Sequence, residues 1–473
     1  MSKYQAYPEY KDSGVEWLGY VPSHWKLTQV KYGYNITLGK MLQKSPKSSV
    51  DILRPYLKAQ NIQPNGINLS KVDQMWFSPE ECKNLLLLPG DVLVSEGGDV
   101  GRSVLWNNEI AECYIQNAIN RVRTVNDNST KFFNYWITYL KASDYINVLC
   151  NKATIAHYTA EKLKASPLLL PMVNEQEQIA DFLDHETAKI DTLIEKQQQQ
   201  LIKLLKEKRQ AVISHAVTKG LNLDVPMKDS GVEWLGNVPT HWNITRIGFH
   251  TLKIGSGKTP KGGAEIYQED GVLFLRSQNI YDDGLRIGKS ESVFISENIH
   301  EEMKGTKVYG GDILLNITGG SIGRSCLVPK NFIETNVNQH VCIIRMPKSL
   351  SEYVSLVMKS VSIKEQIVSI QTGGNREGLN FEQISKFVFC LPSEKERISL
   401  IKYIHFVLKK FDSLESKANE VIRLMQERRT ALISAAVTGK IDVRHWQAPV
   451  THQASNHSAY QSHLCRHDLS KVS

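Results

Sequence analysis

Two long stretches of the sequence repeat mostly apolar residues at alternating steps of three and four. The first runs from about residue 174 to 218, and the second from about 393 to 438. A seam with this period allows a helix to lie along a partner helix over many turns. The first seam is Leu183, Thr187, Ile190, Ile194, Gln197, Leu201, Leu204, Lys208 and Ala211, and the second is Ile404, Val407, Phe411, Leu414, Ala418, Val421, Met425, Arg428 and Leu432.

Both stretches also begin and end alike. Each follows Leu-Pro and opens with a capping-box pattern, Asn174 with Glu177 and Ser393 with Glu396. Each ends in Ala-Val-Thr with a glycine just beyond. We therefore expect each seam to pair with the other copy in the same chain. At about 1.5 Å per residue, such a rod is on the order of 60 Å long, and we expect it to hold two other parts of the chain apart.

The segments that precede the two helices are copies as well. Lys11-Asp-Ser-Gly-Val-Glu-Trp-Leu-Gly-Tyr-Val-Pro-Ser-His-Trp25 returns at residues 228–242 with only two changes. Fainter matches follow in the same order, such as Gly101-Arg-Ser with Gly323-Arg-Ser. The chain is therefore a tandem duplication of a unit of roughly 220 residues, and each unit is a globular part followed by its long helix.

The globular parts have a mixed pattern. Short β-rich runs at Asp91–Ser95, Val272–Leu275, Asp312–Ile317 and Val337–Arg345 alternate with Gly and Asn, and Lys131–Asn147 has a helical pattern. These features predict an α+β fold in each copy.

The two copies differ most in their loops. Residues 40–58 barely align with 255–276, and residues 68–88 barely align with 286–309. A shared frame with divergent loops is typical of one scaffold that presents two recognition surfaces. Neutral drift after duplication is the alternative explanation.

Composition adds few constraints. The 57 Lys and Arg residues against 49 Asp and Glu give a net charge of +8, which permits nucleic-acid binding without requiring it. No apolar run reaches membrane-spanning length and the N-terminus lacks a signal peptide's apolar core, so we expect a cytoplasmic protein. The seven cysteines are scattered and never spaced as Cys-x-x-Cys, which is typical of reduced thiols.

Candidate catalytic motifs are weak. Gly255-Ser-Gly-Lys-Thr259 resembles the end of a phosphate-binding loop, but Leu252 stands where the motif needs glycine and Pro260 prevents the following helix. A turn on a recognition surface is the better interpretation. His24 and His241 lack a neighbouring nucleophile and acid, so the repeated His-Trp pair is expected to pack one element onto another.

The polar segment 443–473 has no counterpart in the first copy, and we expect a loosely ordered tail. Its histidines and cysteine have poor spacing for a metal site. We therefore predict no catalytic residue and no metal ligand in this chain.

The repeated motifs together resemble the DNA specificity subunit of type I restriction-modification systems. They are the doubled Gly-Val-Glu-Trp-Leu-Gly-x-Val-Pro-x-His-Trp, the helix entry Leu-Pro-x-x-x-Glu-Gln-Glu-Gln-Ile-Ala from Leu170 to Ala180, and the helix exit Ala-Val-Thr closely followed by Gly. The resemblance covers about residues 4–443, twice over. The second helix entry, Leu391-Pro-Ser-Glu-Lys-Glu-Arg-Ile398, departs further from the pattern.

The resemblance implies a domain order and a fold. Target-recognition domains at residues 1–171 and 221–391 would be followed by spacer helices at 172–220 and 392–442, with the tail at 443–473. The two long helices would form an antiparallel coiled coil.

The resemblance also implies a function and partners. The chain would bind double-stranded DNA, and each domain would read one half of an asymmetric, bipartite site. Two modification subunits, which carry S-adenosylmethionine and methylate adenine, would clamp onto the rod, and restriction subunits could join them. This chain would catalyse nothing and bind no cofactor, because S-adenosylmethionine, ATP and Mg are expected on the partner subunits.

Candidate base-reading residues are polar side chains on strand ends and turns, since Arg and Lys suit guanine and Asn and Gln suit adenine. They are Lys58, Gln60, Asn61, Ser95, Arg102, Gln116 and Asn117 in the first copy, and Arg276, Ser277, Gln278, Asn279, Asn316, Thr318, Arg324, Asn338, Gln339 and His340 in the second. The motifs shared by both copies would hold either phosphates or the loop itself.

Two further sets complete the predicted sites. For contacts with the DNA backbone we name Lys44, Lys47, Lys258 and Lys261, which flank the divergent turns. The outer face of the first helix is either a partner-docking face or a solvated one, and it carries Glu195, Gln198, Gln199, Lys203, Lys206 and Glu207.

Two other functions stay open. A specificity subunit of a methylation-only or other defence assembly would lack a restriction subunit among its neighbouring genes. An autonomous nucleic-acid enzyme would need a cofactor or metal constellation that the sequence does not show.

Overall fold

A computed structural model describes residues 4–64, 66–150, 157–371 and 378–448 of the chain. The contacts divide the chain into two compact units. Unit 1 is Met1–Glu195 with Ile422–Ser473, and unit 2 is Lys196–Val421. The predicted tail lies outside the described residues from position 449 onward.

The elements of unit 1 are short strands and helices followed by the first part of a long helix. Its strands are β1 (Tyr10–Asp12), β2 (Tyr20–Pro22), β3 (Lys26–Gln29), β4 (Tyr34–Leu38), β5 (Ile52–Leu57), β6 (Ile62–Gln63), β7 (Gly66–Ile67), β8 (Asp73–Phe77), β9 (Val92–Ser95), β10 (Ser103–Leu105), β11 (Tyr114–Ile115), β12 (Ile119–Thr124) and β13 (Pro167–Leu170). Its helices are α1 (Pro79–Leu85), α2 (Thr130–Ala142), α3 (Tyr145–Leu149), α4 (Ala160–Ala165) and α5 (Val173–Lys196), with 3-10 turns η1 (Val30–Tyr32) and η2 (Ala59–Asn61).

The elements of unit 2 follow the same order. Its strands are β14 (Met227–Asp229), β15 (Asn237–Pro239), β16 (Asn243–Arg246), β17 (Lys253–Ser256), β18 (Val272–Leu275), β19 (Ile280–Tyr281), β20 (Gly284–Leu285), β21 (Phe294–Ile295), β22 (Lys307–Val308), β23 (Ile313–Asn316), β24 (Ser325–Leu327), β25 (Thr335–Val337), β26 (Val341–Arg345) and β27 (Val388–Leu391). Its helical elements are η3 (Gln197–Ile202), α6 (Lys203–Lys219), η4 (Ile247–Phe249), η5 (Gly263–Ile266), η6 (Ser277–Asn279), α7 (Glu297–Glu302), η7 (Lys304–Thr306), η8 (Gly319–Ser321), α8 (Lys348–Met358), α9 (Val361–Gln371), α10 (Phe381–Ser385) and α11 (Glu394–Val437), whose last turns belong to unit 1.

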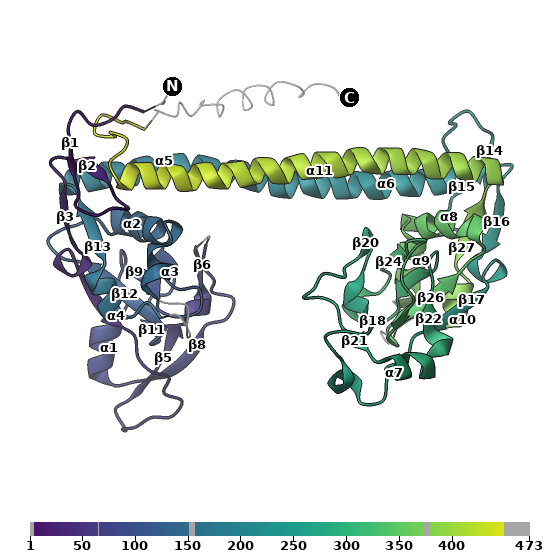
Figure 1. Cartoon of the computed structure of the whole chain (residues 1–473), viewed down its shortest axis with the longest axis horizontal. Coiled ribbons are helices and arrows are strands. Elements are labelled where there is room, and N and C mark those ends of the chain that lie inside the picture. The colour runs from purple at the N-terminus through teal and green to yellow at the C-terminus, as the bar shows by residue number, and fades with distance from the viewer. Residues whose placement is uncertain (1–3, 65, 151–156, 372–377, 449–473) are drawn as a thin grey trace, which may run out of the picture. The chain divides into compact units, whose positions relative to one another are not determined.

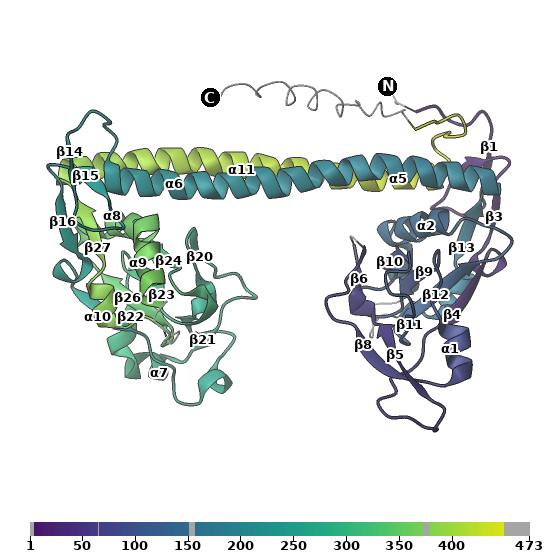
Figure 2. The ribbon, with the colours of Figure 1, turned by 180° about the vertical axis from the view of Figure 1, so that it is seen from behind.

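Both units contain an equivalent four-stranded sheet and equivalent strand pairs (Figures 1 and 2), whereas their second sheets differ in the number of strands. An antiparallel four-stranded sheet has the order β10-β9-β12-β4 in unit 1 and β24-β23-β26-β17 in unit 2. A second sheet contains one parallel pair in each unit, β11 with β5 and β25 with β18. The smaller pairs β1–β2, β3–β13 and β6–β7 recur as β14–β15, β16–β27 and β19–β20. The structure therefore confirms the duplicated α+β unit.

The four-stranded sheet of each unit is buried on both faces, which explains its nearly continuous apolar strands. In unit 2, Ile313 of β23 faces a core that includes Tyr353 of α8, and its neighbour Leu314 faces a second core with Ile343. Successive residues of a strand point to opposite faces, so such a strand needs apolar residues at every position. Unit 1 repeats the arrangement with Val92 and Leu93 of β9.

The two long helices pack side by side in antiparallel fashion (Figure 1). In unit 1, Leu183 of α5 shares a core with Ala436 near the C-terminal end of α11. In unit 2, Ala216 near the end of α6 shares a core with Ile404 near the start of α11. The predicted antiparallel coiled coil is therefore confirmed, because the end of one helix meets the start of the other in each unit.

Equivalent ion pairs join the helices in both units. In unit 2, Arg209 Nη2 lies 2.7 Å from Asp412 Oδ1, and in unit 1 Arg429 Nε lies 2.9 Å from Asp191 Oδ1. The two arginines open the matching segments Arg-x-Ala-x-Ile-Ser, and the two aspartates precede Thr-Leu and Ser-Leu. The same Arg–Asp contact therefore forms once in each unit. Two similar helices that pack antiparallel are expected to show this two-fold repetition.

The register of the first seam differs from the prediction after a π-helical segment. The sequence period places Leu204 in the seam, but Leu204 is 48 % exposed and Leu205 is 6 % exposed. Lys208 and Ala211 are exposed as well, and Ile213 is buried. The π segment η3 takes more residues per turn than an α-helix, so the seam resumes one residue later than a regular repeat predicts.

The second seam shows similar departures without a π segment. Leu414 and Val421 are largely exposed, Arg428 is exposed, and Ile422 is buried. The step after Phe411 is four residues rather than three, because an α-helix with 3.6 residues per turn drifts from a strict heptad. Glu415 therefore occupies the seam position predicted for Leu414, and its carboxylate lies 3.4 Å from Arg209 Nη2.

Three local predictions also need correction. The run Val337–Arg345 is two strands, β25 and β26, joined by a turn. The helical pattern Lys131–Asn147 is divided between α2 and α3, because Asp144 adopts the left-handed conformation with φ 63°. Helix α5 already begins at Val173, so Asn174 is not its N-cap, whereas Ser393 Oγ does accept the Glu396 N–H at 3.4 Å.

The repeated His-Trp motif fastens each globular part to the first turn of a long helix. Glu175, buried at the start of α5, accepts hydrogen bonds from Tyr7 Oη at 2.7 Å and Trp25 Nε1 at 3.1 Å, and it contacts His24 Nε2 at 3.0 Å. A carboxylate is favoured there by the positive end of the helix dipole. The second copy keeps the contact between His241 and Glu396 at 3.1 Å. The predicted structural role of the motif is confirmed.

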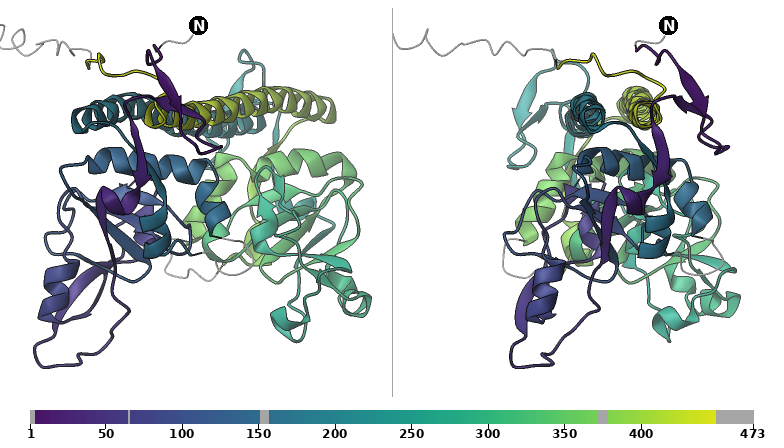
Figure 3. Two further views of the ribbon diagram at one scale, coloured as in Figure 1. Left: turned by 60° about the vertical axis from the view of Figure 1, so that its left-hand side comes forward. Right: turned by 90° about the vertical axis from the view of Figure 1, so that its left-hand side faces the viewer.

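The N-terminal segment lies against the far end of α11 within unit 1 (Figure 3). Tyr10 Oη donates to the carbonyl of Gly439 at 2.9 Å, and the Asp442 N–H donates to the carbonyl of Gln5 at 2.8 Å. Gly439 has φ 72°, and a Cβ there would meet the ring of Pro22. None of the helices in the described ranges is long and apolar enough to cross a membrane.

The shifted seam can be tested with neighbouring leucines. We expect Leu205→Ala to lower the free energy of unfolding by about 2 kcal/mol or more, because it removes buried methyl groups. The exposed neighbour is the control, and Leu204→Ala should stay within about 0.5 kcal/mol of the parent. Urea unfolding followed by circular dichroism measures both. A larger loss of unfolding free energy from Leu204→Ala than from Leu205→Ala would place Leu204 in the seam and contradict the shift.

Candidate nucleic-acid interface

Two of the predicted contact residues are buried asparagines that hold turns. Asn61 Oδ1 accepts the Lys58 N–H at 2.9 Å, and Asn279 Oδ1 accepts the Arg276 N–H at 2.8 Å. The Asn61 side-chain amide donates to the carbonyl of Asn68 at 2.8 Å. The sequence left two roles open for this shared Gln-Asn-Ile motif, contact with phosphate or stabilisation of the loop. The hydrogen bonds of the asparagine to the loop backbone are those of a residue that stabilises the loop.

Ser95 and Asn316 occupy equivalent strand ends and are buried as well. Ser95 Oγ donates to the carbonyl of Gly97 at 3.2 Å. The amide of Asn316 donates to the carbonyl of Ser277 at 2.8 Å, so it ties the end of β23 to the turn η6. These side chains orient the turns that carry exposed candidates. Asn338 is buried in the turn between β25 and β26.

The two arginines of the shared Gly-Arg-Ser motif have different surroundings. Arg102 forms an ion pair with Asp99 and donates to the carbonyl of Ile62 at 2.9 Å. Arg324 is exposed, and its guanidinium lies over the ring of Tyr281 at 4.9 Å. Among the described residues no carboxylate forms an ion pair with Arg324. The arginine is therefore held internally in unit 1 and available in unit 2.

The remaining candidates expose part or all of their side chains. Those exposed are Gln60, Gln278, Gln339, Lys44, Lys47, Lys258 and Lys261, and those partly exposed are Lys58, Gln116, Asn117, Arg276, Ser277, Thr318 and His340. Four of them already have partners, because Lys58 pairs with Asp73, Thr318 Oγ1 lies 2.7 Å from His340 Nδ1, and Arg276 donates to the carbonyl of Glu291 at 3.2 Å. Contact with DNA stays a prediction for each residue in both sets.

The structure brings two predicted groups of unit 2 together. The Lys258 N–H donates to the carbonyl of Val337 at 3.2 Å, and the Gly257 N–H donates to the carbonyl of Val341 at 3.1 Å. The turn with Gln339 and His340 therefore lies directly beside Lys258. A Cβ at Gly257 would overlap the carbonyl of Val337, so only glycine permits this approach.

A duplicated salt bridge supports the strand ends and escaped sequence reasoning. Arg123 of β12 binds both carboxylate oxygens of Asp91, each at 2.7 Å, and Arg345 of β26 binds Asp312 in the same way. Both carboxylates are almost fully buried, so the bidentate geometry satisfies them. The signal was available, because the Gly-Asp pair and the strand-final arginine recur in both copies.

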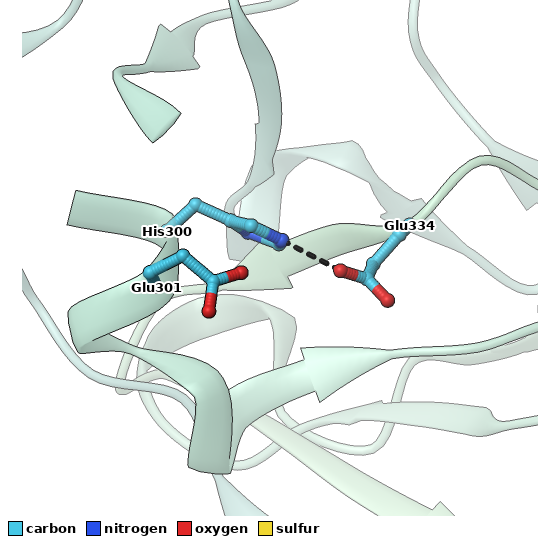
Figure 4. A group of neighbouring side chains, drawn as sticks. All are labelled: His300, Glu301 and Glu334. Atoms are coloured by element: carbon cyan, nitrogen blue, oxygen red, sulfur yellow. Dashed lines mark hydrogen bonds and ion pairs between the residues drawn. The ribbon is translucent and has the colours of Figure 1, made fainter. Parts of the chain in front are cut away.

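His300, Glu301 and Glu334 form a cluster with metal-ligand side chains in unit 2 (Figure 4). His300 Nε2 lies 2.8 Å from Glu334, and its Nδ1 lies 2.6 Å from the amide of Asn336. The Lys307 ammonium lies 2.7 Å from Glu301 and 2.8 Å from Glu334. Both ring nitrogens have partners and the lysine balances both carboxylates, so the cluster has the geometry of an ion-pair network.

The network shifts the pKa values of its members. The hydrogen bond from Lys307 lowers the pKa of both Glu301 and Glu334, and the two carboxylates raise the pKa of Lys307. Contributions from the glutamates are therefore present above their unfolded pKa of 4.5 and are lost as the pH falls through the folded values. The contribution of Lys307 is present below its unfolded pKa of 10.5 and is lost above its folded value.

Comparison with known proteins identifies the family. Residues 24–204 and 246–424 each match the family described as the type I restriction modification DNA specificity domain. The chain belongs to this family. The resemblance carried by the repeated motifs is therefore confirmed, and the function is that of a type I DNA specificity protein. Each matched region includes one globular part and most of its long helix.

Individual relatives agree with the family. The specificity subunit of the type I restriction enzyme EcoBI from Escherichia coli is 25% identical over 384 residues, which cover 79% of this chain and 78% of that protein. The StySPI specificity subunit from Salmonella potsdam is 23% identical over 211 residues, 44% of each chain. A solved structure from work on complex assembly of the type I R-M system shares the fold. Its TM-score is 0.60, and it is 11% identical over 89% of this chain and 99% of that chain.

The helix pair carries exposed residues of two kinds. The predicted docking residues Glu195, Gln198, Lys203, Lys206 and Glu207 are exposed, and the side chain of Gln199 lies outside the described residues. A discontinuous apolar stripe also lies on one face of α11, where Lys410 lies over the ring of Phe406; sequence reasoning assigned two of its residues, Leu414 and Val421, to the seam and missed the other two. The stripe consists of Tyr403 (42 % exposed), Phe406 (59 %), Leu414 (46 %) and Val421 (38 %).

The pH dependence of the ion-pair network is testable. We expect Lys307→Met to reduce the loss of stability of unit 2 between about pH 6 and about pH 3, because protonation of Glu301 and Glu334 then breaks no lysine contact. The control is Lys304→Met, an exposed lysine in the turn η7 that directly precedes Lys307. Urea unfolding midpoints measured across this pH range compare the three proteins. Parallel curves for the parent and Lys307→Met would contradict the assignment.

Proposed function

We propose that this chain is the non-catalytic, DNA-reading subunit of a type I restriction-modification complex, and that it recognises an asymmetric, bipartite site. The observation that carries the proposal is the duplication of one frame with different loops. In unit 1, β5 pairs with the five-residue strand β8, whereas in unit 2, β18 pairs with the two-residue strand β21. Equivalent frames would engage DNA in the same manner, and different loops would read different bases.

The exposed glutamines support this assignment. Gln60 and Gln278 occupy equivalent turns, and the buried asparagine beside each fixes its backbone. A rigid turn with an exposed amide is suited to bidentate contact with an adenine edge, because little backbone freedom is lost on binding. Lys258 and the turn with Gln339 lie together, which would combine a backbone contact and a base contact on one surface.

The partners follow from the helix pair. The apolar stripe on α11 lies beside the seam rather than in it, so a third helix can pack against it. We propose that two modification subunits dock on the long helices and that restriction subunits join them. S-adenosylmethionine, ATP and Mg would be bound by those partners. A methylation-only assembly is the alternative, and it predicts no restriction gene beside this one.

Methylation patterns test the reading of DNA. In cells that express this chain with its neighbouring modification subunit, single-molecule sequencing should find methyl-adenine in each half of a split motif. Exchange of residues 26–165 for those of another specificity protein should change one half only. Exchange of residues 243–390 is the matched experiment and should change the other half. A palindromic motif, or a change in both halves after either exchange, would contradict the proposal.

The docking surface can be tested by charge. We expect Phe406→Glu combined with Leu414→Glu to reduce co-purification of the modification subunit by at least about tenfold, because two carboxylates would be buried in an apolar contact. Ser416→Glu is the control, since this exposed residue is on the same helix and away from the stripe. If the parent, the double variant and Ser416→Glu co-purify equal amounts of the modification subunit, the partner docks on another surface.

A further inference from the structure

Each unit contains a cavity between its globular part and its helix pair. The cavity of unit 2 has a volume of about 910 Å³, and the equivalent cavity of unit 1 has a volume of about 360 Å³. The Gly-Arg-Ser arginine and the helix-pair arginine line both cavities, as Arg324 and Arg209 in unit 2 and Arg102 and Arg429 in unit 1. The cavities are therefore two copies of one feature.

The cations that line the unit 1 cavity all have an acidic partner within the protein. Asp99 forms ion pairs with both Arg102 and Lys141. Lys131 lies 2.9 Å from Asp184, and the ion pair between Arg429 and Asp191 completes the set. No lysine or arginine that lines this cavity is left without an acidic partner among the described residues.

The unit 2 cavity differs in how its cations are paired. Seven lysine and arginine side chains line it, against four carboxylates. Arg324 and Arg286 lie over the same Tyr281 ring, at 4.9 Å and 5.1 Å, and only Arg286 also has a carboxylate partner. In the part of the chain that the structure describes, Lys359 and Lys409 form no side-chain hydrogen bond or ion pair. Among the described residues, Arg324, Lys359 and Lys409 therefore have no acidic ion-pair partner, unlike the cations that line the unit 1 cavity.

Lys359 shows the electrostatic consequence. It follows the C-terminal end of α8, and its backbone carbonyl is bonded to the side chain of Gln210 in α6. Burial lowers the pKa of the Lys359 ammonium, and this effect outweighs the opposite effect of the nearby Asp282 and Asp283 carboxylates. A partly buried cation without a partner is costly, and a bound anion would remove that cost.

We propose that the cavity of unit 2 binds a backbone phosphate of the DNA duplex, so that the duplex is anchored here and not at the equivalent cavity of unit 1. Arg324 at the exposed rim offers a planar guanidinium suited to phosphate, and Lys359 supplies a second charge deeper inside. The wall of the cavity continues into a candidate recognition turn, because Asn316 binds both the Arg324 carbonyl, through its backbone, and the Ser277 carbonyl. This inference rests on the proposed function.

Salt dependence of DNA binding tests the proposal. With the full chain assembled with its modification subunits, we expect Arg324→Gln to reduce the slope of log affinity against log salt concentration by about one. Affinity should fall alike for the target duplex and for unrelated duplex, because a phosphate contact carries no sequence information. Lys409→Gln, a second unpaired cation of the cavity, should also reduce the slope.

The unit 1 cavity provides the matched control. Lys141→Gln removes a cavity lysine that is already paired with Asp99, and it should leave the slope unchanged. A reduced slope for Lys141→Gln, or an unchanged slope for Arg324→Gln, would overturn the asymmetric anchor while the proposed function stands. Failure of the parent complex to bind the motif that methylation sequencing identifies would instead overturn the proposed function.

A small phosphate is the other source of the same chemistry. Thermal melting of the parent and Arg324→Gln chains in inorganic phosphate distinguishes it, with chloride at equal ionic strength as the reference. Stabilisation of the parent alone, together with an unchanged DNA slope for Arg324→Gln, would assign the cavity to a free anion. A reduced DNA slope for Arg324→Gln supports the duplex.

Discussion

The antiparallel packing of the two long helices is the constraint on which the other features of each unit depend. The seam buries apolar residues of both helices, and the Arg–Asp ion pairs at Arg209–Asp412 and Arg429–Asp191 set the same register in both units. Such partly exposed pairs contribute little stability, but they disfavour shifted registers that would leave the charges unpaired. Each globular part then joins the helices through a buried glutamate or its equivalent at a helix start.

The same scaffold serves two different surfaces because its structural and variable residues are separated. Buried asparagines, the Asp91–Arg123 salt bridge and its copy Asp312–Arg345 hold the strand ends in both units. The exposed glutamines and lysines are on the turns between these fixed points. A substitution in a turn therefore changes what is presented without loss of a buried partner, which is the physical basis for two recognition surfaces on one frame.

Equivalent positions do not have equivalent electrostatics. The arginine of Gly-Arg-Ser is paired with Asp99 in unit 1 and stacked on Tyr281 in unit 2, although the motif is identical. The difference arises from one local and one distant neighbour: Asp99, three residues before Arg102, is replaced by Ser321 in unit 2, and Tyr281 occupies the strand position of Gln63. An identical motif therefore does not determine whether its arginine is paired. The residues that surround each arginine determine it.

The sequence by itself determined the duplication, the α+β class, the approximate extent of the two long helices, and the family. Each of these depends on periodicity or on contiguous motifs, which are local properties. The tertiary structure alone decided the register of the seam after η3, the inward orientation of Asn61, Asn279, Ser95 and Asn316, and which cations of the two cavities have acidic partners. These depend on which distant groups meet, because burial and pairing are set by long-range packing and leave no periodic trace in the chain.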